Sequence, residues 1–225
     1  MSASVAMIAE LQIPAGTVTL DGNLAVPEGA LKIVLFAHGS GSSRYSPRNQ
    51  FVAGAFNQVG LATLLFDLLT PEEETEDIHT GKHRFNIALL AVRLGYATQW
   101  TLGQKPTQHL RIGYFGSSTG GGAALVAAAE RPQEICAVVS RGGRPDLAGD
   151  ALTRVRAPTL LIVGGHDPIV IELNERAQQQ MRCETKLKIV PGATHLFEEP
   201  GALDRVAQSA GDWFLHHSVA ASTET

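Results

Sequence analysis

Residues 113–122 read Gly-Tyr-Phe-Gly-Ser-Ser-Thr-Gly-Gly-Gly and lie between an apolar run at 110–115 and an Ala-rich stretch at 120–130. Residues 116–120 have the form G-x-S-x-G, which is typical of a serine on a sharp turn from a strand into a helix. Glycine is expected two residues before and after Ser118, because larger side chains would clash in such a turn. The alternative is a plain glycine-rich turn, but the position between a strand and a helix favours a reactive serine.

The rest of the chain repeats this alternation of apolar strands and helices. An antiparallel hairpin is expected at 5–13 and 17–26, and further strands are expected at 31–37, 61–66, 110–115, 135–140, 159–163 and 187–190. Helices fit at about 47–59, 83–101, 120–130, 168–181 and 202–217. The pattern predicts an α/β fold with a mostly parallel sheet of about seven or eight strands and helices on both faces. Ligands of such sheets bind beyond the carboxyl ends of the strands.

The 225 residues are expected to form one domain, 1–225, with an N-terminal strand region at 1–16 and a disordered tail at 218–225. The connection at 141–158 is too short for a cap domain, so an open or shallow site is expected. The acidic segment at 70–77 is predicted to be a solvated loop, with partial cover of the site as the alternative.

Composition and charge are those of an ordinary globular protein, with 44% hydrophobic and 18% charged residues. A net charge of -4 argues against a broad surface for nucleic acid or anionic membrane. We expect no signal peptide and no membrane span, because no apolar run approaches roughly 20 residues. Two cysteines, Cys136 and Cys183, are too few for a disulfide framework or a zinc site, so a cytoplasmic protein with a buried Cys136 is expected.

A second loop with unusual residues, 37–44, follows the strand at 31–37. Acyl transfer through a tetrahedral intermediate needs at least two donors directed at the oxyanion. The backbone N–H of Thr119 is one candidate, and the N–H of Ser40 is the other, since His-Gly-x is a common form of this loop. A Gly/Ser-rich loop before a helix can instead cradle a phosphate, although neither G-x-x-x-x-G-K-[ST] nor G-x-G-x-x-G occurs in the chain.

Two later loops carry an acid and a base. Asp167 follows the strand at 159–163 and can orient a catalytic imidazole; it is also well placed to cap the next helix. His195 follows the last strand and is the candidate base, with His166 as its rival. The chain order Ser118, Asp167, His195 favours His195, and Asp146 is a reserve candidate for the acid.

Four stretches together resemble the dienelactone hydrolase-like branch of the α/β-hydrolases: Phe-Ala-His-Gly-Ser-Gly-Ser, Gly-Ser-Ser-Thr-Gly, Val-Gly-Gly-His-Asp-Pro and Pro-Gly-Ala-Thr-His-Leu-Phe. The similarity runs from about residue 17 to 217 and extends to hydrolase domains fused to phosphoribosyltransferases. It implies Ser118 as nucleophile, Asp167 as acid and His195 as base. Dienelactone hydrolases proper carry cysteine at the nucleophile position, so Ser118 favours a general carboxylesterase.

The expected activity is that of a serine hydrolase that cleaves small-molecule carboxylic esters through an acyl-enzyme on Ser118, with no metal or organic cofactor. An acyltransferase or thioesterase with the same triad is one alternative, and a catalytically silent binding domain is another. Arg141 and Arg144 follow a strand end, and Arg141 is a candidate for binding an acidic group of the substrate. Loop packing is the alternative role for both arginines. No heptad pattern indicates an oligomeric state.

Overall fold

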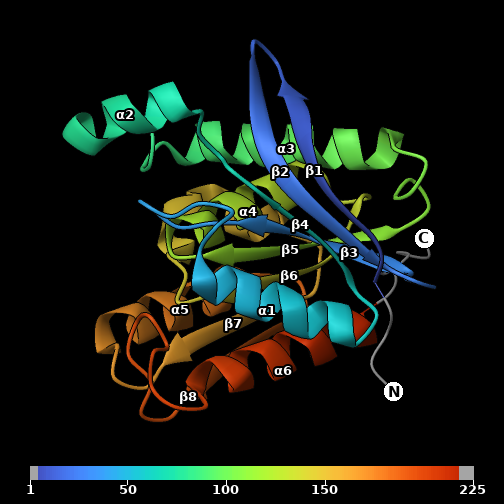
Figure 1. Ribbon diagram of the computed structural model, residues 1–225. Helices are drawn as coiled ribbons and strands as arrows, with labels where there is room; N and C mark the ends of the chain where they lie inside the picture. The colour runs from blue at the N-terminus through green and yellow to red at the C-terminus, as the bar shows by residue number, and fades with distance from the viewer. Residues whose placement is uncertain (1–4, 218–225) are drawn as a thin grey trace, which may run out of the picture.

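The computed structural model describes residues 5–217, so the tail predicted at 218–225 and residues 1–4 lie outside the described part. One sheet has the strand order β1-β2-β4-β3-β5-β6-β7-β8 (Figure 1). Its strands are β1 (Val5–Ala15), β2 (Val18–Pro27), β3 (Lys32–Ala37), β4 (Ala62–Phe66), β5 (Arg111–Ser117), β6 (Ile135–Arg141), β7 (Thr159–Gly164) and β8 (Thr185–Val190). The first two strands are antiparallel, as the predicted hairpin requires, and β3 to β8 run parallel.

Helices cover both faces of the sheet, which confirms the predicted α/β fold (Figure 1). They are α1 (Pro47–Gln58), α2 (Pro71–Thr80), α3 (Ile87–Gly103), α4 (Thr119–Glu130), α5 (Pro168–Gln180) and α6 (Ala202–His216). On one face α1 and α6 pack together through Phe56 and Phe214, whose ring centroids lie 5.6 Å apart. On the other face α3 and α4 contribute Leu94 and Ala124 to a second apolar cluster.

The central strands explain why the candidate site residues lie at one edge of the sheet. Every residue of β3, β6 and β7 is buried, as expected for parallel strands that are covered on both faces. Their registers align the strand ends, since Ala37 pairs with Gly116 and Ser117 pairs with Arg141. The loops that follow β3, β5, β6, β7 and β8 therefore meet at the same edge. Cys136, in β6, is 3% exposed, as predicted.

The prediction of a loop at 70–77 was wrong, because this segment forms helix α2. Thr70 and Glu73 form a reciprocal capping box, in which each side chain accepts a backbone N–H of the other residue. Glutamates in the first turn also interact favourably with the positive end of the helix dipole. Acidic composition was therefore a helix-start signal here, and the helix ends at Gly81 in the left-handed conformation.

The connection between β6 and β7 holds only a short 3₁₀-helical segment, η1 (Pro145–Arg154), which packs against α4 and α5. Within residues 5–217 no cap domain is inserted at this point. In the same range, no helix combines the length and apolar character that crossing a bilayer requires.

Candidate active site

Ser118 occupies a strained turn between β5 and α4, with φ 52° and ψ -122°. Few non-glycine residues adopt positive φ, and such strain is concentrated at functional positions. The flanking glycines are required by close backbone contacts. A Cβ on Gly120 would lie 2.1 Å from the carbonyl oxygen of Ala37, and one on Gly116 would lie 2.4 Å from the carbonyl oxygen of Gly120. The turn has the geometry expected for a nucleophile elbow.

Asp167 and His195 are brought together from the ends of the neighbouring strands β7 and β8. The distance between Asp167 Oδ2 and His195 Nδ1 is 2.6 Å, and the two side chains are 17% and 40% exposed. Asp167 stands at the N-cap position of α5, but its side chain makes no capping hydrogen bond. The carboxylate therefore orients the imidazole, and Nδ1–H donates to it, which leaves Nε2 available as a base.

The other acid and base candidates have different surroundings. Asp146 accepts two hydrogen bonds from Arg144, at 2.8 Å from Nε and 2.7 Å from Nη2, and these two residues neutralise each other. His166 is exposed, and its backbone N–H donates to the carbonyl of Ala193. In residues 5–217 no hydrogen bond joins the Ser118 hydroxyl to an imidazole; such bonds often form only when substrate is bound.

The loop after β3 packs directly against the elbow. Ser40 Oγ and Thr119 Oγ1 lie 3.1 Å apart, so the two predicted oxyanion donors belong to adjacent segments. A Cβ on Gly39 would lie 3.0 Å from Ser118 Cβ and 3.1 Å from the Ser117 carbonyl oxygen. Only glycine allows this approach without displacing the loop.

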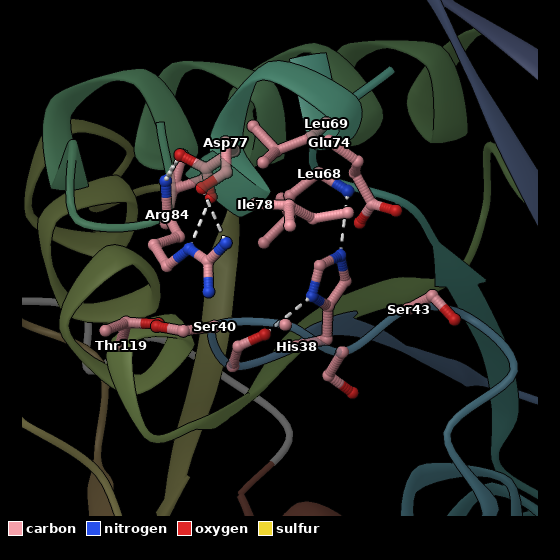
Figure 2. Close-up of a pocket in the computed structure, with 14 residues that line it drawn as sticks. His38, Ser40, Ser43, Leu68, Leu69, Glu74, Asp77, Ile78, Arg84 and Thr119 are labelled. Carbon is pink, nitrogen blue, oxygen red and sulfur yellow. Dashed lines mark hydrogen bonds and ion pairs between the residues drawn. The ribbon is translucent and has the colours of Figure 1, made fainter. Parts of the chain in front are cut away.

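His38 organises the same loop, a role that the sequence analysis did not assign to it. Its Nε2 accepts the backbone N–H of Leu68 at 2.9 Å, so Nδ1 carries the proton and donates to the Gly39 carbonyl at 3.0 Å (Figure 2). Burial lowers the pKa of His38 and keeps the ring neutral. The bond turns the Gly39 carbonyl toward the ring and therefore directs the Ser40 N–H to the opposite side of the trans peptide. The sequence signal for this role of His38 was its position directly before Gly39.

A cavity of about 220 Å³ lies beside this loop (Figure 2). Its apolar walls include Leu68, Leu69 and Leu90, and helix α2 adds Ile78. Helix α2 therefore closes one side of this cavity, in line with the alternative that the segment at 70–77 partly covers the site. Arg93, only 5% exposed, holds α2 through an ion pair with Glu73 at 2.6 Å.

Charged groups also line the cavity. Arg84 donates to both the carboxylate and the backbone carbonyl of Asp77, so this guanidinium is already neutralised (Figure 2). Burial raises the pKa of the Glu74 carboxyl, and the nearby carboxylates of Asp67 and Asp77 raise it further. No group of three His, Cys, Asp or Glu side chains in residues 5–217 is arranged to hold a metal ion.

Arg141 lies outside this cavity. It ends β6, is 8% exposed, and carries its guanidinium carbon 5.9 Å from the centroid of the Phe197 ring. Its Nε and Nη1 have no acceptor among the described residues. Arg144, the other arginine of this loop, is satisfied by Asp146.

The family model of the dienelactone hydrolase family matches residues 22–217. The chain belongs to this family. The solved structure of a dienelactone hydrolase from Anabaena variabilis is 61% identical, with a TM-score of 0.92 over 94% of this chain and 98% of that chain. The family assignment and this similarity show that the chain has the α/β-hydrolase fold.

The chain is also similar to one curated protein and to a second solved structure. A Mycobacterium tuberculosis (strain H37Rv) protein named "Putative phosphoribosyl transferase" is 58% identical over 208 residues, which cover 92% of this chain and 46% of that protein. The chain thus spans about half the length of this relative. Est1E from Butyrivibrio proteoclasticus, 18% identical with a TM-score of 0.77 over 92% of this chain and 98% of its own, shares the fold.

Proposed function

We propose that this dienelactone hydrolase family member hydrolyses small-molecule carboxylic esters through an acyl-enzyme on Ser118. The observation that carries the proposal is the Asp167–His195 pair at 2.6 Å, at the same sheet edge as the strained Ser118. A carboxylate that fixes one imidazole tautomer beside a serine elbow is the arrangement that activates a serine hydroxyl.

The acylation step follows from these positions. His195 Nε2 removes the proton from Ser118 Oγ as that oxygen attacks the ester carbonyl. The negative charge moves to the carbonyl oxygen, which accepts the backbone N–H groups of Ser40 and Thr119 near the N-terminus of α4. The tetrahedral intermediate collapses, the bond to the alcohol oxygen breaks, and His195 donates the proton to that oxygen.

In deacylation, water takes the place of Ser118 as the nucleophile, and His195 again acts first as base and then as acid. A water molecule gives a proton to His195 Nε2 and attacks the acyl carbonyl, and the same two amides hold the second oxyanion. Collapse of this intermediate releases the carboxylic acid and returns the proton to Ser118 Oγ. Neither step needs a metal or an organic cofactor.

The cavity beside the oxyanion loop supports a small acyl group. Leu68, Leu69 and Leu90 give it apolar walls, and about 220 Å³ is enough for a short aliphatic or single-ring acyl chain. We assign this cavity to the acyl side because it borders Ser40 and Thr119, the candidate donors to the acyl oxygen.

The test is labelling with a fluorophosphonate, followed by mass spectrometry of the modified peptide. We expect one adduct on Ser118 and hydrolysis of 4-nitrophenyl acetate, both lost in Ser118→Ala and His195→Ala. Ser209→Ala, in α6 and outside both the 37–44 loop and the cavity, is the control and keeps both signals. A folded protein without an adduct on Ser118 contradicts the proposal and favours a silent binding domain.

A further inference from the structure

The buried guanidinium of Arg141 has no hydrogen-bond partner in the part of the chain that the structure describes. Its Nε and Nη1 are inaccessible to solvent and find no acceptor within residues 5–217, and the residue as a whole is 8% exposed. Burial of an unpaired charge is costly, which is reflected in a pKa of Arg141 lowered to about 10 by desolvation and then by Arg48. A guanidinium in this state is a strong candidate for an anionic ligand.

A second arginine, Arg48, is near enough for its charge to lower the pKa of Arg141, and it pairs with Glu198, the residue after the Phe197 that Arg141 faces. Arg48 lies in the first turn of α1, which contains no acidic residue, although a helix N-terminus disfavours cations. Its Nε is buried without a partner, and its Nη1 pairs with Glu198 at 3.1 Å. The guanidinium groups of Arg141 and Arg48 and the N-terminus of α1 thus place positive charge close together. The exposed carboxylate of Glu198 balances part of this charge.

The pair is close to the proposed chemistry. Arg141 is the register partner of Ser117, and its carbonyl accepts the Ser118 N–H at 3.3 Å. Its guanidinium faces the ring of Phe197, two residues after His195. Since His195 protonates the departing alcohol, the leaving group lies on this side, whereas the acyl cavity lies along residues 38–43 and α2.

We infer that Arg141 and Arg48 form a subsite for an oxyanion group, a carboxylate or a phosphate, on the alcohol portion of the substrate. This inference rests on the proposed ester hydrolysis for its place in the reaction. The binding itself depends only on the two arginines.

Glu198 is the acidic side chain that pairs with Arg48 in the subsite. The side chains of Arg48 and Glu198 are 33% and 63% exposed, and an ion pair so open to water contributes little stability. A ligand oxyanion can therefore replace the Glu198 carboxylate on Arg48 and approach the guanidinium of Arg141 from its Nη2 side, because Nη2 is not among the inaccessible atoms. Removal of the competing carboxylate in Glu198→Gln should tighten anion binding.

The binding test measures thermal unfolding with sodium phosphate or sodium acetate against sodium chloride at equal ionic strength. We expect at least one of the two anions to raise the unfolding temperature of the wild type and of Arg144→Gln, whose arginine is already paired with Asp146. Arg141→Met should lose this increase, and it should be more stable than the wild type in chloride because an unpaired buried charge is removed. Arg48→Gln provides a second variant at a more exposed position. Equal increases in the wild type and both subsite variants, or none in the wild type, overturn the inference.

The kinetic test compares matched esters: 4-acetoxybenzoate with its methyl ester, and 4-acetoxyphenyl phosphate with phenyl acetate. In Arg141→Met, kcat/KM for the preferred anionic ester relative to its neutral partner should fall about 10- to 100-fold, as expected for a lost charge-assisted hydrogen bond. Arg144→Gln should keep the wild-type ratio, and Glu198→Gln should raise it. Unchanged ratios in Arg141→Met overturn the inference. Anion binding that depends on Arg141 in a protein that hydrolyses no ester would instead refute the proposed function.

Discussion

Gly39→Ala tests the contact between the loop at 37–44, which carries the proposed oxyanion donor Ser40, and the strained turn at Ser118. The φ angle of Gly39 lies outside the left-handed region, so alanine introduces no backbone strain there. Its Cβ would, however, lie 3.0 Å from Ser118 Cβ and 3.1 Å from the Ser117 carbonyl oxygen. Because carbon atoms normally pack at about 3.5–4.0 Å, the loop must move away by roughly 0.5 Å.

This displacement acts directly on the proposed oxyanion donor, the N–H of Ser40. Oxyanion donors act at about 2.7–3.1 Å, and removal of one costs about 100- to 1,000-fold in kcat. A shift of roughly 0.5 Å weakens the bond without removing it, so we expect kcat to fall about 10- to 100-fold. KM should change little, since the oxyanion forms only in the transition state.

The assay combines kcat and KM for 4-nitrophenyl acetate, the rate of fluorophosphonate labelling and thermal unfolding. Gly54→Ala in α1 is the matched control, because its Cβ would meet nothing within 4 Å. It should keep kcat and gain up to about 1 kcal/mol in the free energy of unfolding. A folded Gly39→Ala protein with wild-type kcat and labelling rate would refute the role assigned to the loop.

Three further substitutions probe the surroundings of the site. Asp167→Asn should reduce kcat about 10,000-fold with the fold intact, because an amide no longer holds the His195 tautomer; a loss under tenfold would contradict the pairing. Burial lowers the folded-state pKa of His38, so its contribution to stability is complete above the unfolded pKa of about 6.5 and declines as pH falls toward the folded value. Urea unfolding at pH 7.5 and 5.0 should show a smaller decline for His38→Gln, and equal declines would argue against a neutral buried ring. Glu73→Ala removes both the capping box and the partner of buried Arg93, so it should cost about 1–3 kcal/mol and speed proteolysis within α2; an unchanged cleavage rate would show that other contacts hold this helix.

The helices and strands could largely be predicted from the sequence because their patterns depend on short-range effects. Continuous apolar runs indicated strands buried on both faces, and Ser46 before Pro47 marked the start of α1. The error at α2 came from weighing acidic composition above the Thr70–Glu73 capping pair. α3 also begins at Ile87, later than predicted, because Asn86 caps it by accepting the N–H of Leu89.

The strained Ser118 turn could be predicted in part for a related reason, since the contact that demands glycine at 116 is with Gly120 and acts within five residues. The contact that demands glycine at 120 is with Ala37, at the end of another strand. The chain order of Ser118, Asp167 and His195, each after an apolar strand, also indicated which loops should meet. A sequence pattern of this kind specifies backbone conformation and the end of the sheet at which a residue lies.

Side-chain partnerships were decided only by the tertiary structure. Whether Asp167 caps α5 or holds His195, and whether Arg141 finds a counterion, depends on segments that are far apart in the chain. The neutral state of His38 likewise requires its burial against the N–H of Leu68, 30 residues away. Sequence alone determined the elbow and the edge of the sheet that carries the chemistry, because these depend on local sterics and strand patterning. Packing determined the charges, tautomers and cavity, because desolvation and hydrogen-bond partners exist only once distant segments are in contact.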